Sequence, residues 1–214
     1  FINNPTFTRI DFDDAGGGAA LVADGVGAGV TDIRLLAGQA GDSATVTRLV
    51  DTSADEITVS SRRDLETADG VTLSLTNEET INISGSSSSN DLHYATLTAA
   101  DLQTLNISGS ADIKFDNAVS GARVATVNAS AATGATEVHL TNNVIAATMT
   151  GGSGVDEFTG GLLADTITTG SGADLVIGGS GADTLDLGSG NDTVTGSAGA
   201  DIITVGSGTD RVIL

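Results

Sequence analysis

From residue 151 the chain repeats in units of nine residues: GGSGVDEFT (151–159), GGLLADTIT (160–168), TGSGADLVI (169–177), GGSGADTLD (178–186), LGSGNDTVT (187–195), GSAGADIIT (196–204) and VGSGTDRVI (205–213). Every unit has an aspartate at its sixth position: Asp156, Asp165, Asp174, Asp183, Asp192, Asp201 and Asp210. Every unit also has an apolar residue at its eighth position: Phe158, Ile167, Val176, Leu185, Val194, Ile203 and Val212. Because both features recur without a slip, this stretch predicts a repeat architecture.

The composition of each unit predicts its local structure. The first six residues are rich in glycine, which permits positive φ and brings carbonyl oxygens close together, so they predict a turn. The last three predict a short strand whose middle side chain points inward. Two units then form one coil, and successive turns lie on opposite edges of the stack. We expect Asp156, Asp174, Asp192 and Asp210 on one edge, and Asp165, Asp183 and Asp201 on the other.

The aspartates of one edge would stack about 5 Å apart, and such carboxylates repel one another unless a cation lies between them. Residues 151–214 hold nine acidic residues and one basic residue, Arg211, so the segment has almost no counter-charge of its own. Carboxylates and loop carbonyls are hard oxygen ligands of the kind that Ca²⁺ prefers. The alternative is that the aspartates only cap turns in a metal-free solenoid.

Over residues 151–214 the units resemble the RTX nonapeptide, G-G-x-G-x-D-x-U-x. The resemblance implies a Ca²⁺-binding parallel β-roll in which the seven aspartates and nearby loop carbonyls are the ligands. The matching loop glycines are Gly152, Gly154, Gly170, Gly172, Gly179, Gly181, Gly188, Gly190, Gly206 and Gly208. The second unit has Leu162-Leu163 in place of x-G, and the sixth has Ser197-Ala198 in place of G-x. We therefore expect fewer ions on the edge that contains both, about three or four ions in all, and unfolding of residues 151–214 on chelation.

A looser repeat precedes these units. The segments TINIS (80–84), TLNIS (104–108) and TVNAS (126–130) follow one another at intervals of 24 and 22 residues. In each, Thr, Asn and Ser share one face of a strand and the aliphatic pair shares the other. The pattern predicts an all-β fold in which a right-handed parallel β-helix, with two strands per coil, occupies residues 76–150 and continues into the β-roll. Stacking would align Asn82, Asn106 and Asn128, whose amides could form a ladder.

Residues 1–75 contain short alternating runs between Gly, Asp and Ala turns. Two interpretations remain open: irregular early coils of the same helix, or a small β-sandwich. Asp11, Asp13 and Asp14 form an acidic cluster that could hold another Ca²⁺ or could be a solvated turn.

The composition excludes several classes of protein. With 28 acidic and 8 basic residues the net charge is −20, which would repel phosphate, so we expect no nucleic-acid partner. No apolar run is long enough to predict a membrane-spanning helix, and we expect no membrane insertion. The hydrophobic fraction of 39% argues against disorder, and the absence of Cys rules out disulfides and thiolate metal sites. Because the chain does not begin with Met, we expect it to start partway through a longer product.

The sequence contains no signature of catalysis. There is no H-E-x-x-H, no G-x-S-x-G and no phosphate-binding loop in a strand–helix context. The two histidines are His93 and His139; His139 alternates with apolar residues on a predicted strand, so we expect it to point outward as a surface histidine. We therefore expect that the chain is not an enzyme.

The architecture and composition together resemble secreted, self-assembling bacterial surface-layer and extracellular matrix proteins that end in RTX repeats. Low aromatic content, richness in Thr, Ala, Gly and Asn, and the absence of Cys carry this resemblance. It implies type I secretion, calcium-dependent folding outside the cell, and assembly into a surface layer or fibre. The expected partners are copies of the chain itself and cell-surface polysaccharide. Two alternatives remain: a spacer or terminal segment of an RTX adhesin, and the RTX region of a secreted hydrolase whose catalytic domain lies upstream.

Overall fold

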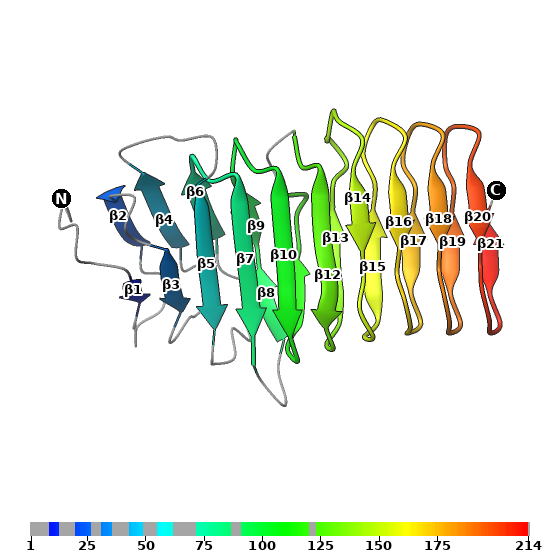
Figure 1. Ribbon diagram of the computed structural model, residues 1–214, viewed down its shortest axis with the longest axis horizontal. Helices are drawn as coiled ribbons and strands as arrows, with labels where there is room; N and C mark the ends of the chain where they lie inside the picture. The colour runs from blue at the N-terminus through cyan, green and yellow to red at the C-terminus, as the bar shows by residue number, and fades with distance from the viewer. Residues whose placement is uncertain are drawn as a thin grey trace.

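The protein folds into one long stack of parallel β-strands (Figure 1). The computed structural model describes residues 9–12, 20–26, 31–35, 43–48, 55–61, 72–86, 91–119 and 123–213, and every regular element in these ranges is a β-strand. No helix in these ranges has the length and apolarity needed to cross a bilayer.

The described strands form three sheets in which neighbouring strands are parallel. The ten-stranded sheet contains β1 (Arg9–Phe12), β3 (Asp32–Leu35), β5 (Glu56–Ser61), β7 (Thr80–Gly85), β10 (Thr104–Gly109), β12 (Thr126–Ala132), β14 (Thr148–Thr150), β16 (Thr166–Thr168), β18 (Thr184–Asp186) and β20 (Ile202–Thr204). The seven-stranded sheet contains β8 (Asp91–Tyr94), β11 (Asp112–Phe115), β13 (Thr136–His139), β15 (Asp156–Thr159), β17 (Leu175–Ile177), β19 (Thr193–Thr195) and β21 (Arg211–Ile213). The four-stranded sheet contains β2 (Ala20–Val26), β4 (Ser43–Arg48), β6 (Thr72–Thr76) and β9 (Thr96–Thr98).

The chain leaves the ten-stranded sheet after each of its strands and returns to it one coil later, so the molecule is an all-β parallel solenoid. This confirms the fold class expected from the repeats. The described strands before residue 76 also pair in series with later ones: β5 pairs with β7, and β6 pairs with β9. The division at residues 75 and 150 stays a prediction, and Asp13 and Asp14 of the acidic cluster lie outside the described residues.

The prediction of two strands per coil is wrong for the coil between β7 and β10. That coil contains both β8, in the seven-stranded sheet, and β9, in the four-stranded sheet. The chain bends at Ala95 between these strands, and the stack exchanges one return sheet for the other at this coil. Tyr94 at the end of β8 stacks on Phe115 of β11 in the next coil, with the ring centroids 5.3 Å apart and both rings buried.

Alternating side chains explain why these segments form strands. In β7 the exposure alternates residue by residue, with Ile81 and Ile83 buried and Thr80, Asn82 and Ser84 half-buried. In parallel register the inward residues form continuous rows along the stack. Each buried aliphatic side chain contributes roughly 1.5–3 kcal/mol relative to exposure. The rows of the C-terminal half run through Met149, Ile167 and Leu185 on one side and through Val138, Phe158, Val176 and Val194 on the other.

The predicted asparagine ladder forms in part. Asn106 Nδ2 donates to Asn82 Oδ1 at 2.7 Å, and Asn82 Nδ2 donates to Glu56 Oε1 at 2.6 Å. Asn128 is in register with Asn106, but its Oδ1 accepts from the backbone N–H and the hydroxyl of Ser130 in its own strand. The pairing register between β10 and β12 shifts just after this position, next to Ser130.

Candidate metal centre

The turns of the nine-residue units form two rows along the edges of the C-terminal half of the stack (Figure 1). One row precedes the strands of the seven-stranded sheet and carries Asp156, Asp174, Asp192 and Asp210. The other precedes the strands of the ten-stranded sheet and carries Asp165, Asp183 and Asp201. The structure therefore separates the seven aspartates into the two groups expected from the sequence.

Within each row the aspartates are joined by hydrogen bonds from coil to coil. Oδ1 of each later aspartate accepts from the backbone N–H of the aspartate one coil earlier. On the first edge Asp156, Asp174 and Asp192 donate in this way to Asp174, Asp192 and Asp210 at 2.8, 2.9 and 3.0 Å. On the second edge Asp165 and Asp183 donate to Asp183 and Asp201 at 2.8 and 3.0 Å. For the first aspartate of each row, Oδ1 accepts from a residue that precedes the repeats. Thr136 N donates to Asp156 Oδ1, and Ala147 N donates to Asp165 Oδ1.

The aspartates are of two kinds, according to whether the second carboxylate oxygen, Oδ2, has a hydrogen-bond partner. Oδ2 of Asp156 accepts from Gly152 N at 2.9 Å, and Oδ2 of Asp165 accepts from Gly161 N at 2.6 Å. Oδ2 atoms of three later aspartates are buried and have no hydrogen-bond partner: Asp174, Asp183 and Asp192. A buried, unpaired carboxylate oxygen is costly, so these three atoms indicate that the loops are built to receive a positive charge.

Backbone conformation accounts for this division. In the units of Asp174, Asp183 and Asp192 the second residue is a glycine with positive φ: Gly170 (98°), Gly179 (99°) and Gly188 (75°). Gly152 and Gly161, which donate to their aspartates, are not in the left-handed region. A left-handed glycine turns its N–H in a different direction, and the carboxylate oxygen loses that donor.

The loops also stack backbone against backbone. A Cβ placed on Gly190 would overlap the carbonyl oxygen of Gly172, and one on Gly208 would overlap that of Gly190. Gly181 meets the backbone of Leu163 and Ala164 in the same way. The matching glycines are therefore required by close approach, and they bring loop carbonyl oxygens near the aspartate rows.

The two departures from the repeat have different structural outcomes. Ser197 takes the position of the second glycine and adopts φ of 74°, so the sixth loop keeps the conformation at the cost of backbone strain. Leu163 replaces the fourth-position glycine and does not take a positive φ, while Leu162 and Leu163 are 47% and 46% exposed. The second loop therefore differs from the later ones on its edge.

Burial and like charge raise the pKa of these carboxyl groups. Burial raises the pKa of Asp156 to about 6, although the Gly152 N–H lowers it, and the Asp174 charge raises it further. Burial raises the pKa of Asp174, and the Asp192 charge adds to the effect. Burial likewise raises the pKa of Asp183, together with the charges of Asp165 and Asp201. The folded roll without cations therefore disfavours the charge state that these groups have at neutral pH.

The sequence did not single out one group that the structure brings together. Glu137, His139 and Glu157 each offer a ligand atom, and the three atoms lie within 4.8 Å of one another. His139 is a half-buried outward residue as expected, but it has defined partners and is not an isolated surface side chain. Alternation places Glu137 and His139 on one strand face, yet only the pairing of β13 with β15 adds Glu157.

Comparison with protein families supports the assignment of the repeats. A model of the RTX calcium-binding nonapeptide repeat (4 copies) matches residues 150–185, 159–194 and 177–212. Comparisons with curated proteins and with solved structures find no similar chain. The matches lie within residues 150–212, so this part of the chain carries RTX calcium-binding nonapeptide repeats, which are typical of secreted bacterial proteins.

Proposed function

We propose that this chain is a secreted structural protein that folds on binding Ca²⁺ outside the cell and then assembles with its own copies into a surface layer or fibre. The observation that carries the proposal is the set of buried, unpartnered Oδ2 atoms on Asp174, Asp183 and Asp192. The role is structural and not enzymatic. It includes export by type I secretion and attachment to cell-surface polysaccharide.

The donor set of the loops fits Ca²⁺. Each inter-loop gap is bordered by aspartate oxygens and by carbonyl oxygens of stacked glycine loops, and hard oxygen ligands suit this ion. When bound, Ca²⁺ supplies the positive charge that the repeats lack. The aspartates whose Oδ2 is unpartnered are the proposed principal ligands, with Asp201 and Asp210 continuing the rows. Two such atoms belong to the edge of Asp174 and Asp192 and one to the edge of Asp183, which favours fewer ions on the second edge.

The concentration dependence supports folding outside the cell. Extracellular calcium modules have dissociation constants of about 0.1–1 mM. Ca²⁺ at ten times the dissociation constant stabilises the folded state by about 1.4 kcal/mol per site, and a few sites together decide whether a small β-roll folds. In the low-calcium cytoplasm the same carboxylates oppose folding, so the chain stays in a form suited to export.

The assembly part of the proposal is supported by the resemblance of the architecture and composition to self-assembling surface-layer and extracellular matrix proteins.

Electron microscopy and far-UV circular dichroism of the purified chain test the proposal. We expect ordered layers or fibres in 10 mM Ca²⁺ and none in EDTA, and we expect EDTA to reduce the β-sheet signal because residues 151–214 unfold. Mg²⁺ at the same concentration is the matched control, because it prefers six ligands at shorter distances and keeps its waters. Monodisperse particles with and without Ca²⁺ would refute self-assembly. A β-sheet spectrum that EDTA leaves unchanged would refute calcium-dependent folding.

A further inference from the structure

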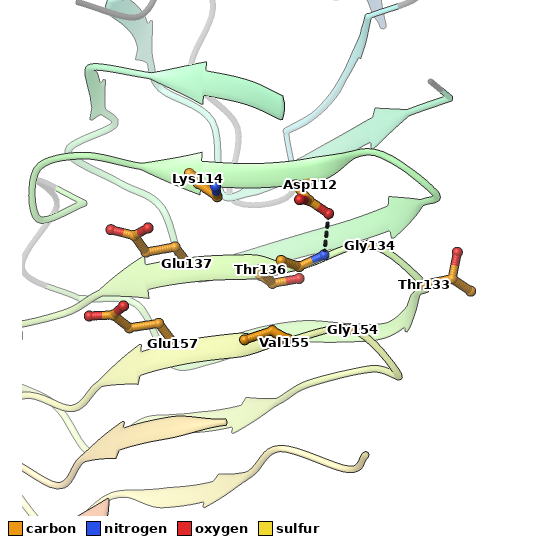
Figure 2. A pocket seen from close by; sticks show the side chains of 10 residues that line it. Asp112, Lys114, Thr133, Gly134, Thr136, Glu137, Gly154, Val155 and Glu157 are labelled. Atoms are coloured by element: carbon orange, nitrogen blue, oxygen red, sulfur yellow. Dashed lines mark hydrogen bonds between the residues drawn. The ribbon is translucent and has the colours of Figure 1, made fainter. Parts of the chain in front are cut away.

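The outer face of the seven-stranded sheet carries a mixed nitrogen and oxygen cluster that lies apart from the calcium loops. Glu137 and His139 belong to β13, the last strand of this sheet before the repeats, and Glu157 belongs to β15, the first strand of the repeats. Register pairs Glu137 with Glu157 and His139 with Thr159. Figure 2 shows the two glutamates on adjacent strands with their carboxylates on the same side.

The two glutamates form a like-charge pair in a direct cross-strand position, which is unfavourable in the absence of a cation. Lys114 is the neighbour of Glu137 on the other side, whereas Leu175 is the neighbour of Glu157. The row of Lys114, Glu137 and Glu157 therefore has one more negative than positive charge. Glu137 and Glu157 are among the residues that line a groove of about 460 Å³, and the side chains of both are partly exposed.

His139 is held between two partners. Its Nδ1 lies 3.0 Å from Thr159 Oγ1, and its Nε2 lies 3.0 Å from Glu137 Oε1. When Nδ1–H donates to the nearly buried Thr159 hydroxyl, the lone pair of Nε2 faces the carboxylates. Metal-binding histidines are commonly oriented in this way by a second partner on the other ring nitrogen. A proton on Nε2 joins it to Glu137 Oε1 at this distance, and a metal ion in place of the proton would need the two atoms to move slightly apart.

We propose that Glu137, His139 and Glu157 bind a first-row divalent metal ion such as Zn²⁺, separately from the Ca²⁺ of the loops. One imidazole and two carboxylates suit Zn²⁺, and an imidazole is a poor ligand for Ca²⁺. Ligand atoms at 2.0–2.2 Å from a tetrahedral ion lie about 3.4 Å apart. The three ligand atoms lie within 4.8 Å of one another here, and rotation of the glutamate side chains would bring them to that spacing. A fourth position stays open to water.

The location gives the ion a structural role. It would join the β-helix strand β13 to the first repeat strand β15, on the face of β15 opposite to that of the buried Asp156. Binding would therefore stabilise the junction between the two parts of the solenoid even when Ca²⁺ is saturating.

Isothermal titration with Zn²⁺, and visible absorption with Co²⁺, test the site on the whole chain in 10 mM Ca²⁺, which keeps the loops filled. We expect one Zn²⁺ per chain, a tetrahedral Co²⁺ spectrum and a higher melting temperature on Zn²⁺ addition. His139→Ala and Glu157→Gln should each weaken Zn²⁺ binding by at least about tenfold and remove the thermal shift. Both side chains point outward, so circular dichroism should show that the fold in Ca²⁺ is retained.

His93→Ala is the matched control, because it removes the other histidine of the chain, whose strand β8 lies two strands beyond β13 in the same sheet. We expect it to bind Zn²⁺ as the unchanged protein does. Absence of Zn²⁺ binding by the unchanged protein, equal binding by His139→Ala, or equal loss in His93→Ala would each overturn the proposal. Glu157→Gln keeps the shape of the side chain. If His139→Ala fails to fold, unchanged Zn²⁺ binding by Glu157→Gln would overturn the proposal.

Discussion

Replacing Asp174 by Asn changes one atom of a loop aspartate and removes its charge. Oδ1 can still accept the backbone N–H of Asp156, which lies at 2.8 Å, so the hydrogen bond between coils survives. The buried Oδ2, which has no partner, becomes an amide nitrogen that cannot bind a cation. The substitution therefore tests the proposed ligand with little change in the packing of the loop.

The expected effect follows from the position of Asp174 in its row. It lies between Asp156 and Asp192, so it borders two inter-loop gaps. At saturating Ca²⁺ the free energy of unfolding rises by about 1.4 kcal/mol per bound ion for each tenfold increase in concentration. Asp174→Asn should lose two ions and so lower this slope by about 2.7 kcal/mol per tenfold. In EDTA the same variant should keep at least as much β-sheet signal as the unchanged protein, because it removes a buried charge.

Urea unfolding followed by far-UV circular dichroism, at several Ca²⁺ concentrations above 1 mM, measures the slope. Asp186→Asn is the matched control: it removes one carboxylate from β18 in the same part of the stack, where the side chain is exposed and not in a turn. We expect the control to keep the full slope. A full slope in Asp174→Asn would refute the ligand assignment, and an equal loss in both variants would show that Ca²⁺ acts only by screening charge.

Three further predictions concern acid, strain and close packing. In EDTA, lowering the pH from 7 to 4.5 should favour the folded roll: the pKa of Asp156 is raised to about 6 from its usual 3.8, so its contribution is complete only below 3.8 and is lost as the pH rises through 6, which gives at most about 2 kcal/mol between pH 7 and 4.5. A β-sheet signal in EDTA that is no larger at pH 4.5 than at pH 7 would contradict this. Ser197→Gly should raise the free energy of unfolding by urea in 10 mM Ca²⁺ by up to about 1 kcal/mol, because Ser197 has φ of 74°; a lower free energy of unfolding would show that the strain is not significant. Gly190→Ala should cost at least about 3 kcal/mol in the same assay, since the residue has φ of 145° and its Cβ would overlap the Gly172 carbonyl; a change below 1 kcal/mol would show that the loops separate easily.

The sequence alone was sufficient for the features that depend on local periodicity. A period of nine with a fixed aspartate assigns each side chain to a turn, an inward row or an outward row, because a strand alternates its faces and two units close one coil. The separation of the aspartates into two rows, the buried row through Phe158 and Val176, and the parallel all-β fold were all predicted in this way. Alternation within TINIS likewise predicted which side chains are buried.

Other features depend on how one coil meets the next. Whether Oδ2 of an aspartate is paired depends on the φ of a glycine four residues earlier, and Gly152 and Gly170 occupy the same place in the repeat but differ in φ. The same holds for the third strand between β7 and β10, and for Asn128, which bonds within its own strand just before the register of β10 and β12 changes.

The Glu137, His139 and Glu157 cluster is the clearest case of a feature that only the tertiary structure decided. The two strands are offset by 20 residues at this junction, between the 22-residue spacing upstream and the 18-residue coil of the repeats, so neither period of the sequence aligns Glu137 with Glu157. Periodicity determines which face a residue takes, because that depends on its own strand. Which residues meet across that face depends on the register between coils, and where the coil length changes only the folded structure specifies it.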